Sequence, residues 1–256
     1  MKNSSTIYIR NSNQICFLFY PKIGSTNLKA KEIAKNNLHG WTVVLANSQS
    51  KGYGKGKRFW FSPAGGLYFS LILPKISVKK LQLLPFVTAI AVVKTIREKS
   101  SLKAVIKWPN DILAPSYFQK KPAFKKVAGI LVENIVGEKS RTSIAGVGIN
   151  TNIKSFPKYL SPEATSIFRE QGKNVDNKEI LSLFLKLFRE FLKKNNREIL
   201  KEYKKYEILI GRKIRTVVQN KKVPGTVLDF DKDGAIMIKL KEDKIIKILE
   251  GSLELT

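Results

Sequence analysis

A glycine-rich basic stretch is the part of this sequence best suited to chemistry: Gly52-Tyr53-Gly54-Lys55-Gly56-Lys57-Arg58. Its alternating glycines let backbone N–H groups turn toward an anion, and its cations can neutralise that anion. The stretch is not a Walker A loop, because it lacks the Gly-Lys-Ser/Thr spacing, and Lys57 occupies the third glycine position of the dinucleotide fingerprint. Taken alone, a flexible lysine-bearing surface loop explains these residues equally well.

A second polar segment is Lys107-Trp108-Pro109-Asn110-Asp111. A lysine and a carboxylate four residues apart, across a turn set by proline, could bind a phosphate and its Mg²⁺ together. An ordinary exit from a strand into a turn, with a packed tryptophan, explains the same residues.

Two further positions fit recognition of an apolar ligand with one acidic end. Lys126 opens the apolar run 127–133, and a cation at the mouth of such a strand suits a single carboxylate. Lysines are so common in this chain that chance also explains that placement. In Gly146-Val147-Gly148-Ile149-Asn150 the glycines permit close approach of a ligand, although a bulge or tight packing would use them as well.

Apolar runs and capping residues predict the elements that position these groups. Buried strands are expected at 15–20, 41–46, 67–73, 127–133 and 143–149, the last two paired at the centre. Gly24-Ser25-Thr26-Asn27 caps a first helix, and Pro85 lies in the first turn of a helix over 83–98. Asp176 and Glu179 form a capping-box pattern ahead of a helix whose apolar stripe runs from Ile180 to Phe191.

The tail from 212 to 256 changes to short alternating strands, with turn signals at Asn220, Pro224-Gly225 and Asp233-Gly234. This pattern predicts a small antiparallel barrel joined near Ile210-Gly211, and therefore two domains, 1–210 and 211–256. Strands and helices that mix without a regular βαβ rhythm favour the α+β class over a doubly wound sheet.

Composition excludes several classes of protein. With 256 residues and 43% hydrophobic content the chain can bury a sizeable core, yet it has no apolar run of the ~20 residues that cross a bilayer. Met1 to Asn13 lack the apolar stretch of a secretory signal. The single cysteine, Cys16, excludes an internal disulfide framework and predicts a reducing cytoplasm. With His39 as the one histidine, a Cys/His zinc site or a chymotrypsin-like triad is not expected.

The formal net charge of +27 raises the possibility of a nucleic-acid partner. Arginine, the usual reader of bases, supplies only nine of the 47 basic residues, and no nucleic-acid-binding motif accompanies the charge. A solvated lysine surface is therefore the favoured interpretation. A nucleic-acid-binding module stays an alternative, and it predicts a steep salt dependence with sequence preference.

Five segments in this order resemble the biotin protein ligase family. They are Ser25-Thr26-Asn27, Gln49 with 52–63, 107–111, 126–133 and 146–150. Members make biotinyl-5′-AMP from biotin and ATP and pass biotin to a lysine of a carboxylase carrier domain. The resemblance extends from residue 15 to the C-terminus. It implies a central mixed β-sheet flanked by helices, like class II synthetases and biotin–lipoate ligases, with a small C-terminal SH3-like barrel.

The resemblance also implies residue roles. Ser25, Thr26 and Gln49 would hydrogen-bond the ureido ring, Lys126 would bind the biotin carboxylate, and Trp60 would pack the folded loop. The biotin-binding set is Ser25, Thr26, Asn27, Gln49, Gly52, Tyr53, Gly54, Lys55, Lys126, Gly129 and Gly148. The ATP-binding set is Lys55, Arg58, Lys107, Asn110, Asp111 and Asn150, with Asp111 also holding Mg²⁺. The catalytic set is Lys55, Arg58, Lys107 and Lys126.

Three loop positions depart from the family pattern, and these departures bear on how tightly the enzyme retains the adenylate. Tyr53 and Lys55 stand where arginines are usual, and Lys57 stands in place of a glycine. A lysine keeps the charge of arginine but loses its bidentate fork.

The resemblance further implies partners and exclusions. A carboxylase carrier domain is the expected partner, a homodimer is possible, and neither a membrane nor a specific DNA site is expected. Bifunctional members have an amino-terminal winged helix-turn-helix, and the residues before Ser25 are too few for one. A related ligase for lipoate remains an alternative. Gln49 with Ser25-Thr26 favours a ureido ring, because a dithiolane has no hydrogen-bonding groups.

Overall fold

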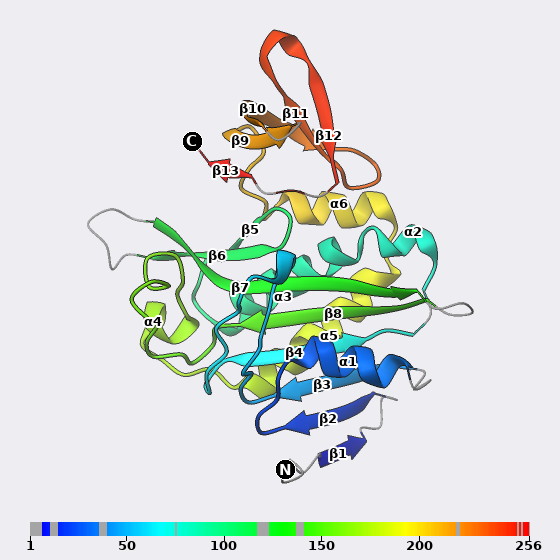
Figure 1. Ribbon diagram of the computed structural model, residues 1–256, viewed down its shortest axis with the longest axis vertical. Helices are drawn as coiled ribbons and strands as arrows, with labels where there is room; N and C mark the ends of the chain where they lie inside the picture. The colour runs from blue at the N-terminus through cyan, green and yellow to red at the C-terminus, as the bar shows by residue number, and fades with distance from the viewer. Residues whose placement is uncertain are drawn as a thin grey trace.

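A computed structural model describes residues 7–10, 15–35, 40–74, 76–116, 123–136, 141–218, 221–249, 251 and 253–255. Its main body is built on an eight-stranded sheet of order β1-β2-β3-β4-β8-β7-β6-β5 (Figure 1). The strands are β1 (Ile7–Arg10), β2 (Cys16–Tyr20), β3 (Thr42–Ala46), β4 (Leu67–Ile72), β5 (Val105–Lys107), β6 (Asp111–Ser116), β7 (Ala123–Val136) and β8 (Arg141–Ile149). Among the strands that the structure describes in this sheet, β2 and β3 pair in parallel and the other neighbours pair antiparallel, so the predicted α+β class with a central mixed sheet is confirmed.

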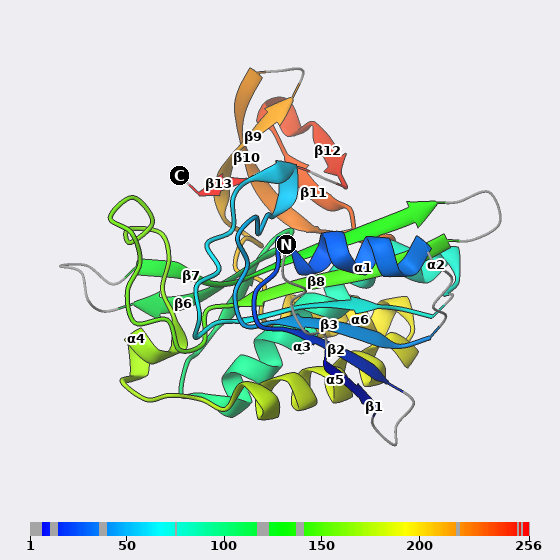
Figure 2. The same ribbon diagram turned by 60° about the horizontal axis from the view of Figure 1, so that its bottom comes forward.

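Helices cover both faces of this sheet (Figure 2). The helices are α1 (Thr26–Lys35), α2 (Val78–Leu81), α3 (Leu84–Lys99), α4 (Ile167–Gln171), α5 (Asn177–Lys193) and α6 (Asn196–Lys204). α1 lies on one face with its own small apolar cluster, while α3 and α5 build the main core on the other. The spacing of Phe86, Ala89, Ile90, Val93 and Ile96 predicts one apolar face on α3. Ala91 and Val92 are buried as well, because α3 is enclosed by the sheet, α5 and α6.

The predicted capping box at Asp176 and Glu179 is wrong in one half. Asp176 is the N-cap of α5 and accepts a hydrogen bond from Lys178 N (2.7 Å). The Glu179 carboxylate instead pairs with Lys99 of α3 at 2.8 Å, because α3 packs beside α5 and offers it a cation. A reciprocal capping box occurs at Asn195 and Glu198, where α6 begins.

The predicted pairing at the centre of the sheet is confirmed. β7 and β8 are antiparallel neighbours, with Gly129 opposite Gly148 and Leu131 opposite Gly146. The segment between the motifs 107–111 and 126–133 forms the β6–β7 hairpin, and residues 117–122 of that segment lie outside the described residues.

The tail folds into a five-stranded antiparallel sheet of order β12-β11-β10-β9-β13. Its strands are β9 (Lys213–Val218), β10 (Lys221–Phe230), β11 (Ile236–Lys239), β12 (Ile245–Ile248) and β13 (Glu254–Leu255). This sheet lies next to α6, beyond the β5 edge of the main sheet (Figure 1). Phe230 of β10 joins the ring cluster of Phe86 and Tyr203, so the tail shares the main apolar core.

The turn signal at Asp233-Gly234 is confirmed, and Asn220 lies outside the described residues. The predicted turn at Pro224-Gly225 is wrong, because both residues lie inside β10, opposite Arg215 and Ile214. β10 pairs with β11 only from Thr226 onward, so the missing N–H of Pro224 interrupts no ladder on that side.

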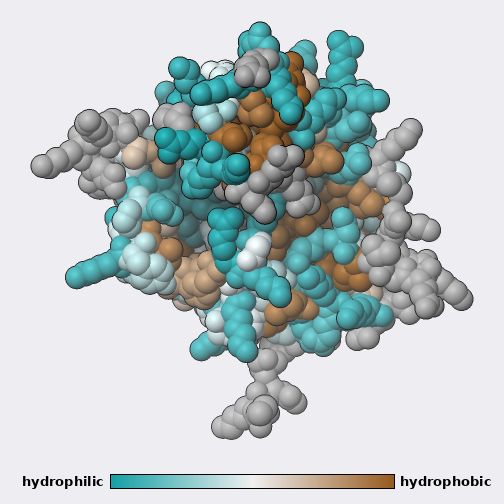
Figure 3. Space-filling model, turned by 45° about the horizontal axis from the view of Figure 1, so that its top comes forward, coloured by the Kyte–Doolittle hydropathy of each residue, from teal (hydrophilic) through white to brown (hydrophobic). Residues whose placement is uncertain are grey.

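Lysines such as Lys178, Lys186 and Lys201 are exposed on the surface, as the sequence predicts. Hydrophilic side chains project over most of the face in Figure 3. Within the described part of the chain, no helix combines the length and apolar character needed to cross a bilayer.

Candidate functional site

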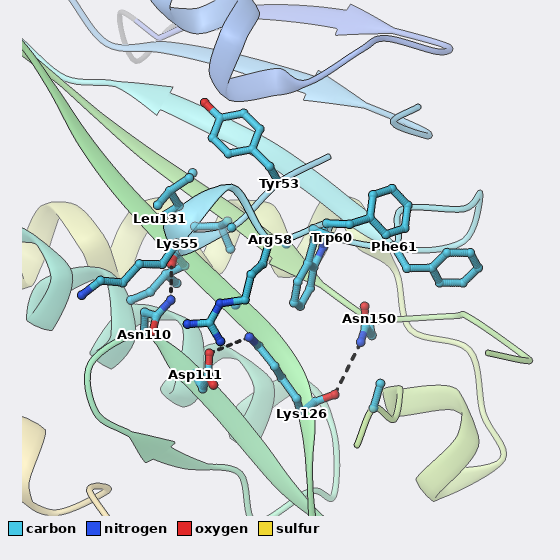
Figure 4. Close-up of a pocket in the computed structure, with 18 of the residues that line it drawn as sticks. Tyr53, Lys55, Arg58, Trp60, Phe61, Asn110, Asp111, Lys126, Leu131 and Asn150 are labelled. Carbon is cyan, nitrogen blue, oxygen red and sulfur yellow. Dashed lines mark hydrogen bonds and ion pairs between the residues drawn. The ribbon is translucent and has the colours of Figure 1, made fainter. Parts of the chain in front are cut away.

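The five motifs converge on one cavity of about 600 Å³ (Figure 4). It is bounded by the start of α1, the glycine-rich loop, the turn between β5 and β6, the faces of β7 and β8, and the segment 156–164. The predicted site residues that line it are Ser25, Thr26, Asn27, Gln49, Tyr53, Gly54, Lys55, Arg58, Lys107, Asn110, Asp111, Lys126, Gly129, Gly148 and Asn150. Gly52 is not among them. Any Cβ on Gly52 would lie 2.7 Å from Ser62 Oγ and from Trp60 O, so this glycine lets the two arms of the loop meet.

Glycines make the floor of the cavity flat. Gly129 and Gly148 face each other across β7 and β8, and the indole of Trp60 lies directly on them. A Cβ on Gly148 would come within 2.4 Å of Trp60 Nε1, and a Cβ on Gly129 within 3.0 Å of the ring. The missing side chains of these glycines therefore leave room for the Trp60 indole of the loop. This is the tight packing that was one of the interpretations of the glycine pattern in the sequence.

A β-bulge turns Lys126 toward this floor. Ile112 of β6 pairs with Ala128, but Leu113 pairs with Lys126, so Val127 is the extra residue of the bulge. In a regular strand Lys126 and Gly129 would face opposite sides, because side chains alternate. The bulge brings them to one side, where Lys126 Cε lies 3.3 Å from the position of a Gly129 Cβ.

The Lys126 ammonium lies beside Asp111 and Arg58 in the cavity (Figure 4). Its Nζ is 2.6 Å from Asp111 Oδ1 and 5.0 Å from the centroid of the Trp60 ring. Figure 4 shows the Arg58 side chain extending toward Asp111 and Lys126. Among the described lining residues the cations are Lys55, Arg58, Lys107 and Lys126, against the carboxylates Asp111 and Glu163. The cavity is therefore suited to anionic ligands.

The glycine-rich loop is folded as a hairpin. Gln49 N donates to Ser62 O (3.0 Å), Trp60 N to Gly52 O (2.9 Å) and Gly54 N to Arg58 O (2.8 Å). At its tip, Gly56 and Lys57 have φ of 67° and 59°. A left-handed conformation costs a non-glycine residue about 1 kcal/mol, which gives a physical reason for the glycine that usually stands at the position of Lys57.

Glu133 of β7 anchors this hairpin to the body. Its Oε2 accepts hydrogen bonds from Tyr53 Oη (2.9 Å) and Asn27 Nδ2 (2.8 Å), and its Oε1 pairs with Lys31 Nζ at 2.7 Å. Burial acts to raise the pKa of Glu133, but the bonds from Lys31, Asn27 and Tyr53 outweigh it and the pKa is lowered. Burial and the Glu133 carboxylate raise the pKa of Tyr53, so its hydroxyl stays protonated as a donor. Sequence reasoning missed Glu133 as a site residue, because its role depends on three distant partners.

Replacing Glu133 with glutamine should change how stability depends on pH. Because the folded-state pKa of Glu133 is lowered from 4.5, its contribution is complete above that pH and is lost as the pH falls through the folded-state pKa. We expect the Tm of wild type to exceed that of Glu133→Gln near pH 7, with the difference shrinking in acid. The same scan on Glu190→Gln, an exposed acid of α5, corrects for lost charge. A difference independent of pH would contradict the assignment.

Hydroxyls and amides line the end of the cavity near α1. Gln49 Oε1 accepts from Thr26 N (2.8 Å) and Thr26 Oγ1 (3.1 Å), and Gln49 Nε2 donates to Ser62 Oγ (2.9 Å). Ser70 of β4 donates toward Thr26 Oγ1 at 2.8 Å and also toward Asn27 Oδ1. Ser62 and Ser70 were missed, although a serine inside the apolar run 67–72 is a signal that could have found Ser70.

The turn between β5 and β6 presents Lys107 and Asp111 from adjacent strands, where they are register partners. Asn110 connects the turn to β7. Its side-chain Nδ2 donates to Ile130 O (3.3 Å), and its main-chain oxygen accepts from Ile130 N (3.0 Å). Trp108 is buried beneath the turn, as the simpler interpretation of this segment expected.

The segment 156–164 was missed, because it has neither helical nor strand periodicity. It lies along β7 through Lys126 N to Glu163 O (2.8 Å) and Thr165 N to Lys126 O (2.9 Å). Asn150 holds it in place, with Nδ2 donating to Thr165 O (2.9 Å). The segment contributes Phe156, Leu160 and Pro162 to the cavity, which gives the cavity an apolar wall.

Two buried polar atoms at the cavity have no hydrogen-bond partner among the described residues. They are the Nε1 donor of Trp60 and the Oδ1 acceptor of Asn150. Buried polar groups are generally paired in native proteins, so Asn150 Oδ1 is an unpaired acceptor beside the cavity, whereas Trp60 Nε1 lies against Gly148 on the floor.

Comparison with known proteins agrees with this geometry. Residues 20–150 match the model of the Biotin/lipoate A/B protein ligase family. The bifunctional ligase/repressor BirA of Bacillus subtilis (strain 168) is 34% identical over 247 residues, which cover 93% of this chain and 73% of that protein. BirA of Escherichia coli (strain K12) is 28% identical over 239 residues, with 89% and 70% covered.

A solved structure has the same fold. The biotin protein ligase from Aquifex aeolicus in complex with biotin and ATP superposes with a TM-score of 0.77 at 30% identity, covering 94% of this chain and 99% of that one. The chain therefore belongs to the Biotin/lipoate A/B protein ligase family, and within it to the biotin protein ligases.

Proposed function

We propose that this cavity binds biotin beside the α-phosphate of ATP, and that the chain uses it to make biotinyl-5′-AMP and transfer biotin to a carrier protein. The chain is an ATP-using ligase by its family. The observation that carries the assignment to this cavity is the convergence of Lys55, Arg58, Lys107 and Lys126 on one space.

The charges fit the first half-reaction. A carboxylate oxygen of biotin attacks the α-phosphorus, the bond to the β-phosphate oxygen breaks, and pyrophosphate leaves. Two anions must approach each other, so the enzyme must supply positive charge where negative charge concentrates. Lys126 would bind the biotin carboxylate, with Lys55 and Arg58 around the α-phosphate and Lys107 on the outer phosphates.

The second half-reaction needs no nucleophile from the enzyme. The lysine amine of the carrier attacks the acyl carbon, the bond to AMP breaks, and the amine loses a proton. Until then the hairpin loop would exclude water from the mixed anhydride. This use of the loop gives the Tyr53–Glu133 contact a function, since it holds the hairpin over the cavity.

The two ends of the cavity fit the two substrates. Ser25, Thr26 and Gln49 would surround the ureido ring, with Asn27 holding their helix in place. The apolar wall of Phe156, Leu160 and Pro162 would pack against the purine base, and the unpaired Asn150 Oδ1 would accept a hydrogen bond from it.

Mg²⁺ is a further proposal. Among the described residues, Asp111 pairs with Lys126 through Oδ1, so its Oδ2 could bind a cation together with Asn110 and the phosphates. One carboxylate with phosphate ligands is a usual set for Mg²⁺, so these residues fit it. Bound there, the ion would neutralise phosphate charge. Omitting Mg²⁺ should lower pyrophosphate release without weakening biotin binding.

The test of the function is pyrophosphate release that requires both biotin and ATP, followed by transfer of labelled biotin to a biotin carrier domain. Lipoate in place of biotin is the control for the related ligases. Failure of both steps in a folded sample would contradict the proposal, and lipoate-dependent turnover would reassign the substrate.

Removing the Tyr53 hydroxyl should loosen the loop. Tyr53→Phe keeps the ring but loses the hydrogen bond to Glu133, so we expect biotinyl-5′-AMP to dissociate several-fold faster with little change in Tm. Tyr159→Phe, at an exposed tyrosine, is the matched control. Adenylate retention equal in the two variants would show that the contact does not hold the loop.

The remaining proposals concern organisation. The boundary near residue 210, the SH3-like character of the tail, a cytoplasmic location and a homodimer stay predictions. So does the absence of specific DNA binding, which a salt titration with random and defined duplexes would test.

A further inference from the structure

The linker between α6 and the C-terminal sheet is hydrogen-bonded to the strand that carries Lys107. Ile106 N donates to Tyr206 O (2.8 Å), and Ile208 N donates to Ile106 O (3.0 Å). Residue 207 therefore lies beside β5 in a short parallel bridge. Any shift of this linker acts directly on the strand that ends at the turn.

The Glu207 side chain reaches from this linker to the turn. Its Oε1 accepts from Trp108 N (3.3 Å), and its Oε2 accepts from Leu209 N (2.7 Å) and Ile210 N (3.1 Å). Burial raises the pKa of Glu207, although these backbone donors act against that rise. One carboxylate thus joins the turn after β5 to the chain that enters the C-terminal sheet.

Tyr203 lies behind this contact. Its hydroxyl is buried without a hydrogen-bond partner in the described part of the chain. Its carbonyl oxygen accepts a hydrogen bond from Glu207 N (3.2 Å), and burial, with the carboxylates of Glu207 and Asp111, raises the pKa of its phenol. Its ring packs on Phe86 (4.5 Å between centroids) and Phe230 (5.4 Å), which makes a rigid backing from α3 and β10.

We infer that Glu207 is a positioning residue for the nucleotide half of the reaction, holding the Trp108 main chain so that Lys107 and Asp111 face the cavity. This inference rests on the proposed function. The competing explanation is that Glu207 only caps the linker through Leu209 and Ile210.

The experiment uses the full chain with Glu207→Gln, which keeps the shape but loses the charge. We expect the KM for ATP to rise about tenfold, the scale of a lost hydrogen bond to a charged group. The Kd for biotin without ATP should rise by a clearly smaller factor, since the turn meets the biotin end only through the Asp111–Lys126 pair, whereas Lys107 and Asp111 both face the nucleotide. Glu202→Gln is the matched control, an acid of α6 that pairs with Lys94 and Lys205 and does not contact the turn. It should lower Tm without changing the KM for ATP.

A second variant separates the two explanations if Glu207→Gln folds poorly. Glu207→Asp shortens the side chain, so it can still cap residues two and three positions later but withdraws from Trp108. A raised KM for ATP in this variant supports positioning, and a normal KM overturns it.

A double-mutant cycle locates the effect. If Glu207 acts through the turn, Glu207→Gln should add little to Lys107→Met, whereas independent sites give additive losses. Additive losses, or equal changes for ATP and biotin, overturn the inference. Wild-type pyrophosphate release tests the proposed function separately, so the two failures are distinguishable.

Discussion

Lys126→Ala should weaken the use of biotin by about 2–5 kcal/mol, the range for removing one partner of a charge pair that the bound ligand would shield from water. The truncation removes the ammonium that would meet the biotin carboxylate. It also strips the 2.6 Å partner from Asp111 and the cation from the face of Trp60. We expect the loss in kcat/KM for biotin, measured by pyrophosphate release at saturating ATP.

A second substitution tells which of these losses matters. Asp111 left without a partner in the cavity would repel the biotin carboxylate, and Asp111→Asn in the Lys126→Ala background would relieve that repulsion. If biotin use recovers fully, the role of Lys126 is to neutralise Asp111. Because Asp111 is also proposed to hold Mg²⁺, recovery is measured as the Kd for biotin without ATP, and a Kd that does not recover shows that Lys126 binds biotin directly. Lys186→Ala, at an exposed lysine of α5, is the control, and unchanged biotin kinetics in Lys126→Ala would show the assignment to be wrong.

Gly146→Ala should destabilise the fold by about 1–3 kcal/mol, the usual cost of overpacking, and should impair biotin binding with it. The added Cβ would lie 2.1 Å from Asn27 Oδ1 and 2.8 Å from its Nδ2. Asn27 cannot move aside freely, because Ser70 and Glu133 hold the two ends of its amide. The clash is therefore expected to displace the start of α1.

Chemical denaturation and biotin calorimetry would measure both effects. Gly24→Ala is the matched control, since nothing lies within 4 Å of its added Cβ. Removing the obstacle should restore stability, so Asn27→Ala with Gly146→Ala should cost less than the two single changes together. Additive costs, or full stability of Gly146→Ala, would contradict the close contact.

Much of the site could be predicted from the sequence, because each motif is formed by residues that are close together in the chain. The alternation in Gly146-Val147-Gly148 puts both glycines on one face of a strand whatever the fold, and the turn chemistry of Pro109-Asn110 ends β5 where expected. Five such motifs in order are what made the family recognisable. The α+β class followed from the mixture of strands and helices.

Other features depend on partners that are distant in the chain. Glu179 has the spacing of a capping box, yet the neighbouring Lys99 takes its carboxylate. Pro224-Gly225 has the composition of a turn, yet the pairing of β10 with β9 keeps it extended. Glu133 and Glu207 carry no local signal, because each gains its role from donors on separate elements.

Lys126 illustrates the difference between what the sequence determines and what the tertiary structure determines. Its charge and its place at the mouth of an apolar strand follow from the order of residues alone. The tertiary structure determines which face of the sheet the Lys126 side chain lies on. One extra residue in β7 opposite β6 reverses the usual alternation of side chains between the two faces. A bulge arises only when two strands pair, so the packed sheet, and not the local pattern, brought the ammonium onto the glycine floor.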